Sequence, residues 1–177
     1  MHLLLDLCRR YQEPHRHYHT LEHIGGMLHA GRAFPLDDAQ TLAVWFHDAI
    51  YDPTRTDNEE QSAALARDLL PTTGAAGPLV DRVARIVLDT KRHVPSTPDA
   101  AAVLDLDLMS LAAPWPQFAA NTAAIRAEFA HVPDEAFRRG RADFFTRMLQ
   151  CERLFWTDWG KALEAPARDN LRRAAAG

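Results

Sequence analysis

The chain has 177 residues, which is enough for one domain with a sizeable apolar core. Hydrophobic residues make up 47% of the chain and charged residues 25%, and the net charge is −4 with no long basic or acidic block. This composition excludes the strongly basic character that binding to a nucleic acid polymer or a membrane surface requires. Cys8 and Cys151 fit no metal-ligand spacing, and no apolar stretch approaches the roughly 18 residues of a membrane span. We therefore expect a cytoplasmic protein from a reducing compartment.

The hydrophobic pattern is helical throughout, with no alternating strand run and no short hairpin signal. It predicts an all-α fold that forms a single domain over residues 1–177. We expect helices over residues 3–11, 19–32, 38–50, 58–70, 79–90, 99–111, 115–129, 134–149 and 166–173.

Helix ends are indicated by proline and by capping residues. Pro14 stops the first helix, and the second ends before Pro35, because the residue before a proline disfavours the helical conformation. The carboxylate of Asp37 can accept from free backbone amides and so cap the third helix. Residues 42–46 of that helix are all apolar, which predicts a central, buried helix.

Later helices carry charged residues at informative positions. Asp57 or Asn58 can cap the fourth helix, which places Glu59 in its first turn, where the helix dipole favours acids. Arg141 lies four residues from both Phe137 and Phe145, on the apolar side of the eighth helix. This position predicts a buried arginine that is paired with an acidic group.

Histidine is the unusual component of the sequence. The chain has nine, and four of them fall within nine residues, namely His15, His17, His19 and His23. Such a cluster is either a solvated polar helix start or a set of metal ligands, for which imidazole is the commonest side chain. On the expected helix, His19 and His23 share a face. We expect four histidines to be exposed to solvent, namely His2, His15, His29 and His131.

Two acidic segments favour the metal interpretation. His47 and Asp48 directly follow the apolar run, and Asp105 and Asp107 lie in a helix rich in leucine and alanine. A buried carboxylate is costly without a partner, and one divalent cation would supply a partner to all of these groups. Asp105 can instead orient a ligand or pair with an arginine. Nitrogen and oxygen donors without sulfur suit Mn, Fe, Co, Ni, Zn or Mg, and they argue against a structural cysteine-type zinc site.

The order of these segments resembles the HD-domain superfamily of metal-dependent phosphohydrolases, and most closely a bacterial group of predicted HD phosphohydrolases. The resemblance extends over residues 11–171. It is carried by the segments RHYHTLEHI, WFHDAIYD, DNEEQSA, TKRH, LDLDLMSL, IRAEF, FRRGR and ARDNL.

The resemblance implies an HD-domain helical bundle, with a metal-binding core at about 15–112 and additional C-terminal helices at about 114–173. It also implies that one divalent metal ion is held by His19, His47, Asp48 and Asp107. Leu106 replaces a residue that is often small in the family, and Ala112 replaces a common glycine. Neither departure affects a ligand.

The implied activity is a phosphomonoesterase acting on a small phosphorylated, nucleotide-like substrate, because a bound cation lowers the pKa of a water molecule and polarises a phosphoryl oxygen. The expected catalytic residues are Arg16, Asp52, Glu59 and His93, and the expected substrate-binding residues are His23, Lys91 and Arg92.

Each of these roles has an alternative. Arg16, Lys91 and Arg92 can hold phosphate oxygens, but the last two are also an ordinary basic helix end. Asp52 or Glu59 can act as a general acid or orient a ligand, although Glu59 also complements the helix dipole.

Two histidines stay open between several roles. His93 can face phosphate, bind a second metal or cap a helix. His23 can orient a ligand, contact substrate or bind the metal itself.

Other functions within and outside the superfamily stay open. Hydrolases of guanosine polyphosphate alarmones resemble His-Asp-x-x-Glu-Asp, whereas this chain keeps only Asp52 of the last pair. HD-type di-iron oxygenases and cyclic-dinucleotide phosphodiesterases have two extra histidines before the last ligand. Only His93 lies there in this chain, so a mononuclear site is favoured unless His23 compensates. A regulatory module that binds a metal or a nucleotide without turnover is the alternative to an enzyme. The sequence leaves the oligomeric state open.

Overall fold

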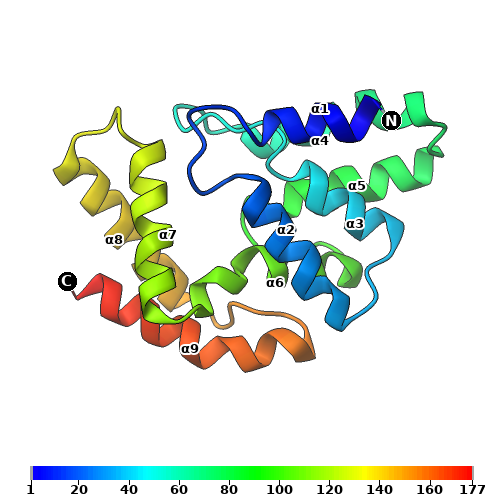
Figure 1. The fold of residues 1–177 in the computed structure, drawn as a ribbon. Helices are drawn as coiled ribbons and strands as arrows, with labels where there is room; N and C mark the ends of the chain where they lie inside the picture. The colour runs from blue at the N-terminus through cyan, green and yellow to red at the C-terminus, as the bar shows by residue number, and fades with distance from the viewer. Residues whose placement is uncertain (1, 177) are drawn as a thin grey trace.

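A computed structural model describes residues 2–176, and in these residues it contains nine α-helices and no β-strand (Figure 1). The all-α class predicted from the sequence is confirmed. The helices are α1 (His2–Arg10), α2 (Leu21–Ala30), α3 (Asp38–Phe46), α4 (Asn58–Leu69), α5 (Gly77–Thr90), α6 (Ala101–Leu108), α7 (Trp115–Glu128), α8 (Asp134–Gln150) and α9 (Asp158–Ala175). No helix in the described residues is long and apolar enough to cross a membrane.

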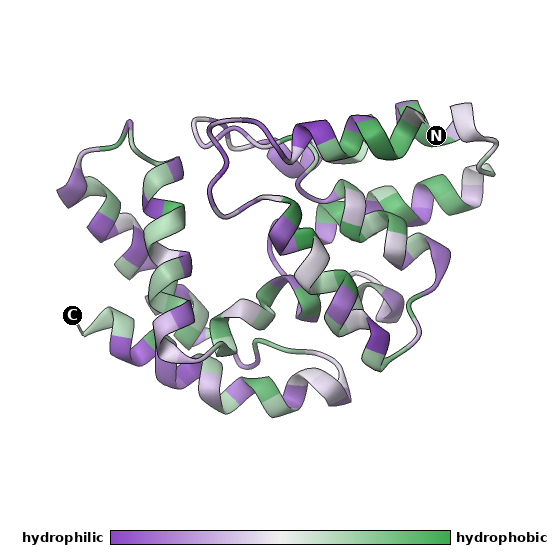
Figure 2. Ribbon diagram, in the orientation of Figure 1, coloured by the Kyte–Doolittle hydropathy of each residue, from purple (hydrophilic) through white to green (hydrophobic). Residues whose placement is uncertain are grey.

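The helices form two neighbouring groups with separate apolar clusters. Helices α1 to α6 surround the larger cluster, in which α4 packs on α5 and α3 packs on α5. Helices α7, α8 and α9 pack around a smaller cluster that also takes in residues 108 and 111, at the end of α6 and just after it. Figure 2 shows hydrophobic and hydrophilic residues alternating around α8 and α9, as expected for helices that bury one face. The chain between α6 and α7 joins the two groups.

Helix α3 begins as the sequence predicts. Asp37 accepts a hydrogen bond from the backbone N–H of Gln40, and the Gln40 side chain accepts one from the backbone N–H of Asp37. This reciprocal pair satisfies amides that the helix itself cannot use. The helix buries Ala43, Val44 and Phe46, which confirms its central position.

Two helix boundaries differ from the predictions at residues that matter for the site. Helix α2 begins at Leu21, because Thr20 is extended and caps the helix through the Glu22 amide. His19 therefore precedes the helix, and the predicted shared helical face of His19 and His23 is wrong. Helix α3 ends at Phe46, so His47 lies at its C-terminal cap.

The last helix begins eight residues earlier than predicted and runs through Pro166. Its start is fixed by Asp105, which is fully buried. The Asp105 carboxylate accepts from the backbone N–H of Trp156 at 2.7 Å, and from the N–H and hydroxyl of Thr157 at 2.8 and 2.6 Å. Asp105 thus neither orients a metal ligand nor pairs with an arginine, which corrects both sequence-based alternatives. Those alternatives failed because its partners are 51 and 52 residues away.

Gly160 is required where α9 crosses Asp105. A Cβ atom there would overlap Asp105 Oδ2 and lie 2.7 Å from Phe155 Cβ. We expect Gly160→Ala to lower the free energy of unfolding by about 1–3 kcal/mol, because the overlap outweighs the better helix propensity of alanine. Gly140→Ala is the matched control, since a Cβ there meets nothing within 4 Å. Urea denaturation of both variants measures the difference, and an unchanged midpoint for Gly160→Ala would contradict this account.

Candidate metal centre and adjoining cavity

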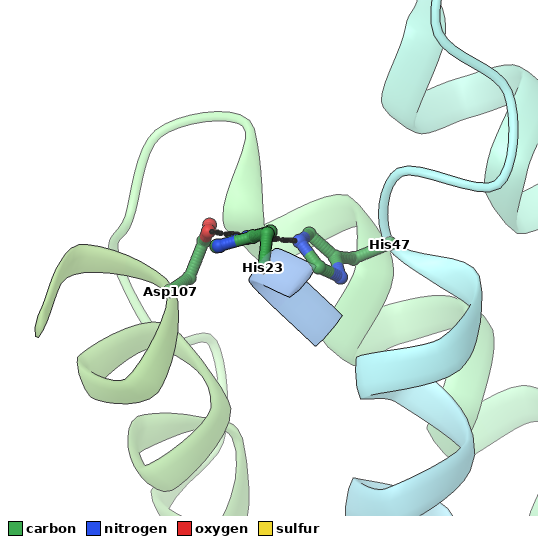
Figure 3. Close-up of side chains that lie close together, drawn as sticks. All are labelled: His23, His47 and Asp107. Carbon is green, nitrogen blue, oxygen red and sulfur yellow. Dashed lines mark hydrogen bonds and ion pairs between the residues drawn. The ribbon is translucent and has the colours of Figure 1, made fainter. Parts of the chain in front are cut away.

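Three side chains from separate helices converge on one point. His23 Nε2 lies 3.3 Å from His47 Nε2 and 3.2 Å from Asp107 Oδ1, and His47 Nε2 lies 3.6 Å from the same oxygen. Figure 3 shows His23 between the other two. Two ligand atoms bound to one cation at about 2.1 Å lie about 3.0 Å apart in an octahedral site and about 3.4 Å apart in a tetrahedral one. The observed distances fit a shared cation.

Asp48 adds a carboxylate to this cluster. Its Oδ2 atom lies 2.9 Å from His47 Nε2 and 4.0 Å from His23 Nε2. The cluster therefore offers two imidazole nitrogens and two carboxylates, with no sulfur. This donor set suits Mn, Fe, Co, Ni or Zn.

Hydrogen bonds orient two of these ligands. His47 Nδ1 lies 2.9 Å from the carbonyl oxygen of Val44. A carbonyl only accepts, so Nδ1 carries a proton, and Nε2 is the nitrogen that faces the cluster. His93 Nε2 lies 3.0 Å from Asp107 Oδ2, which leaves Oδ1 of Asp107 to face His23 and His47.

His93 is held in a strained backbone conformation. Its φ of 52° lies in the left-handed region, and the Trp156 indole N–H donates to its carbonyl oxygen at 3.0 Å. Such strain persists only where the surroundings impose it. The position of His93 against Asp107 is therefore fixed by contacts from outside its own segment.

The electrostatics of the cluster favour a cation. Burial lowers the pKa of His47, but the carboxylates of Asp48 and Asp107 outweigh burial and hold this pKa well above its usual value. Burial alone would raise the pKa of Asp107, but the neighbouring His47 outweighs burial and holds the pKa of Asp107 well below its usual value. The two acids thus stabilise positive charge where the ligand atoms converge.

His19 lies beside this cluster. Its Nδ1 is 2.7 Å from Glu128 Oε2, and its ring stacks on Tyr51 with centroids 4.1 Å apart. Of the four residues that the resemblance implies as ligands, His47, Asp48 and Asp107 lie together. The structure places His23, expected to contact substrate, closer to them than His19. His19 Nε2 has no hydrogen-bond partner within the described part of the chain, so His19 stays a candidate further ligand.

Glu128 is a site residue that the sequence did not single out. It comes from the last turn of α7 and is 4% exposed. One oxygen accepts from the backbone N–H groups of His17, Tyr18 and His19 at 2.7–2.9 Å, and the other accepts from His19 Nδ1 and the Tyr51 hydroxyl. Despite burial, His19 lowers the pKa of Glu128 to about 2. Two signals were available in the sequence: its place between Ile125 and Phe129 on an apolar face, and its place in the segment IRAEF of the family resemblance.

Arg16 has a different role from the one expected. It is 5% exposed, and its guanidinium donates to Glu13 and to the backbone carbonyls of His19, Asp48 and Ala49 at 2.7–3.3 Å. These bonds tie the histidine loop to the end of α3. The expected contact with phosphate is wrong, because the donors of Arg16 are already used inside the protein.

A cavity of about 290 Å³ adjoins the cluster. Asp48 and Asp107 line it, and so do Glu59 and His93, two of the expected catalytic residues. Its opposite wall comes from α7 and α8 and includes Arg141. The cavity thus lies between the two helix groups and is bounded by both.

Of the seven expected catalytic and substrate-binding residues, only Glu59 and His93 line this cavity, and Lys91, Arg92 and Asp52 lie away from both the cavity and the metal cluster. Lys91 donates to the Thr56 carbonyl and to the Glu60 carboxylate at 2.6 Å, and Arg92 lines a different cavity. The Asp52 carboxylate accepts from the N–H and hydroxyl of Thr54 at 2.8 and 2.7 Å, within a turn. Their predicted contacts with substrate are therefore corrected. The sequence showed their charge but not their direction.

The remaining histidines mostly match expectation. His29 and His131 are exposed. His15 is also exposed, although its Nε2 lies 2.8 Å from the Tyr51 carbonyl oxygen. The side chain of His2 lies outside the described part of the chain.

No family model matches the chain, and comparisons with the curated proteins and with the solved structures found no significant match.

Proposed function

We propose that the chain is a metal-dependent phosphohydrolase of the HD type, acting as a phosphomonoesterase on a small substrate. The observation that carries the proposal is the convergence of His23, His47 and Asp107 at the edge of a cavity that Asp48 also lines. A buried cluster of this kind, next to a cavity of substrate size, is the usual setting for metal-assisted hydrolysis.

The donor set fits a divalent cation without rearrangement. Two neutral imidazole nitrogens and two carboxylates balance its charge, and the distances between them match those of a shared ligand sphere. When bound, such a cation supplies Lewis acidity to a phosphoryl oxygen and lowers the pKa of a nearby water molecule.

The chain's own residues would position the reactants. His93 holds one oxygen of Asp107 and so directs the other to the cluster. Glu59 lines the cavity and can carry a proton to or from the reacting oxygens. Its carboxylate lies 3.7 Å from Lys91 Nζ, which gives Lys91 a supporting position rather than contact with substrate.

The size of the cavity supports a small substrate. A volume of about 290 Å³ lies at the lower end for ligand pockets. The nucleotide-like character of the substrate rests on the resemblance to the HD superfamily alone.

A phosphoester screen tests the proposal. Purified protein loaded in turn with Mn²⁺, Co²⁺, Ni²⁺, Zn²⁺ or Mg²⁺ is assayed with a panel of phosphomonoesters, pyrophosphates and phosphodiesters. Phosphate release is measured for the phosphomonoesters, and the products of the other two classes are separated by chromatography. We expect hydrolysis of at least one phosphomonoester, and loss of that activity on adding a chelator. Binding of metal without hydrolysis of any compound would favour a regulatory binding module instead.

A further inference from the structure

Arg141 is a partly buried cation whose hydrogen-bonding groups are not used. Its Nε atom is buried and has no hydrogen-bond partner among the described residues. The guanidinium packs against the rings of Phe144 and Phe145, with Cζ 4.8 and 4.7 Å from their centroids. The sequence predicted a paired arginine, but no ion pair of Arg141 occurs within residues 2–176. That prediction is wrong, because the residues around Arg141 are aromatic.

The other arginines that are not exposed in the described residues all have partners, which makes Arg141 unusual among them. Arg126 donates to the Asp134 carboxylate and to two backbone carbonyls, and Arg168 donates to the Glu164 carboxylate and to three backbone carbonyls. Arg16 is likewise satisfied by one carboxylate and three carbonyls. The Phe144 and Phe145 rings offer no oxygen or nitrogen acceptor, so these contacts leave the N–H groups of Arg141 without a conventional hydrogen bond. Arg141 is therefore ready to donate to something outside the chain.

The position of Arg141 indicates what it would bind. It lines the same cavity as Asp48 and Asp107, and the Tyr18 and Tyr51 phenols line that cavity too, with their pKa values raised above the usual value by burial. These phenols are neutral at neutral pH, so they leave the arginine without a counter-ion. Burial lowers the pKa of Arg141, which also marks a charge that lacks a partner.

The charges on the two sides of the cavity complement a small anion. Asp48 and Asp107 balance one divalent cation, so the metal centre adds no net charge to attract an anionic substrate. Arg141 supplies that charge from the opposite wall. A guanidinium binds phosphate through two parallel hydrogen bonds, and Asn121 and Thr122 of the same wall add neutral hydrogen-bonding groups.

We propose that Arg141 binds the phosphate group of a phosphomonoester substrate in the cavity beside the metal centre, an inference that rests on the proposed phosphohydrolase function. Apolar side chains of the same cavity, including Phe118, Ile125 and Phe129, would contact the organic part of the substrate. Arg141 is then a substrate-binding residue that comes from the C-terminal helices.

Phosphate binding tests the role of Arg141 without relying on turnover. Inorganic phosphate is titrated calorimetrically into Mn²⁺-loaded wild-type protein, Arg141→Met and Arg141→Lys. We expect Arg141→Met to weaken phosphate binding by about tenfold or more, and Arg141→Lys to weaken it less, because lysine keeps the charge but loses the planar fork. Mn²⁺ affinity should stay within about twofold of wild type for both variants, since Arg141 makes no contact with the metal cluster.

Thermal unfolding separates binding from a structural role. Met keeps the length and apolar packing of the side chain, so Arg141→Met should unfold at the same temperature as wild type or higher. Arg139→Met is the matched control, since Arg139 is an exposed arginine on the same helix. It should bind phosphate like wild type.

Two results would overturn the inference. One is wild-type protein that binds no phosphate, and the other is Arg141→Met that binds phosphate as tightly as wild type. Failure of the proposed function has a separate signature, namely Arg141-dependent phosphate binding by a protein that hydrolyses no phosphoester.

Discussion

Asp107→Asn is expected to weaken divalent-cation binding by about 100-fold or more. Within residues 2–176, Asp107 is the one residue whose oxygens contact three histidines, His23, His47 and His93. Asparagine keeps its shape but removes the charge that balances the cation. Its side-chain nitrogen, facing His93 or the cluster, would also donate where an acceptor is needed. A 100-fold loss corresponds to about 2.7 kcal/mol of binding free energy.

Thermal unfolding with and without cation gives a second readout. A cation present at about 100 times its dissociation constant stabilises the folded protein by about 2.7 kcal/mol. For a chain of this length that raises the unfolding temperature by about 5–10 °C. The wild type should show this rise, and Asp107→Asn should not. Asp169→Asn, at an exposed carboxylate on α9, is the control and should behave as wild type. An equal rise in Asp107→Asn would place the cation elsewhere.

Glu128→Ala is expected to lower the free energy of unfolding by about 3–5 kcal/mol, the range for breaking a buried, charged hydrogen-bond network. The carboxylate accepts from three successive backbone N–H groups of the loop that precedes α2, from the His19 ring and from the Tyr51 hydroxyl. Alanine leaves these donors unsatisfied, at a cost of about 1–3 kcal/mol for each one that water does not reach. Urea denaturation measures the loss.

Glu128→Gln separates the role of Glu128 in orienting the His19 ring from its role in the stability of the fold. Glutamine keeps one acceptor oxygen for the loop amides but presents an N–H₂ group to either His19 or Tyr51. We expect a smaller loss of stability, with the His19 ring no longer fixed. If His19 contributes to cation binding, affinity falls by about 10- to 100-fold, as for other groups that orient a ligand. Glu152→Ala is the control, because that side chain is 92% exposed. Wild-type stability of Glu128→Ala would show that the network does not hold the loop.

Most of the fold could be predicted because its signals are local. Apolar periodicity, together with capping residues and prolines, located the nine helices of residues 2–176, and the Asp37 cap gave the start of α3 correctly. The errors arose where a capping residue competes with a continuing pattern. Thr20 caps the start of α2, so His19 lies outside that helix. Asp105 fixes the start of α9 by accepting hydrogen bonds from residues that are 51 and 52 positions further along the chain. No local pattern carries that second kind of information.

The candidate site divides in the same way. The types of residue that bind metals, next to apolar runs, drew attention to His47, Asp48, Asp105 and Asp107, and only the resemblance to the HD superfamily favoured Asp107 over Asp105. Contacts between distant segments decided the rest. Arg16 and Lys91 looked alike as phosphate ligands by charge, but each donates to groups inside the protein. Arg141 looked like a paired arginine, and only the fold shows that it faces a cavity without a partner.

The most direct test of the metal centre is a crystal structure of protein loaded with Mn²⁺ or Co²⁺, with diffraction data collected at the absorption edge of the metal. The anomalous difference map should show one strong peak about 2.0–2.3 Å from His23 Nε2, His47 Nε2 and an oxygen of Asp107. The same map shows directly whether Asp48 and His19 complete the ligand set. A map without a peak between these side chains, or with its peak at another place on the protein, would contradict the proposed centre.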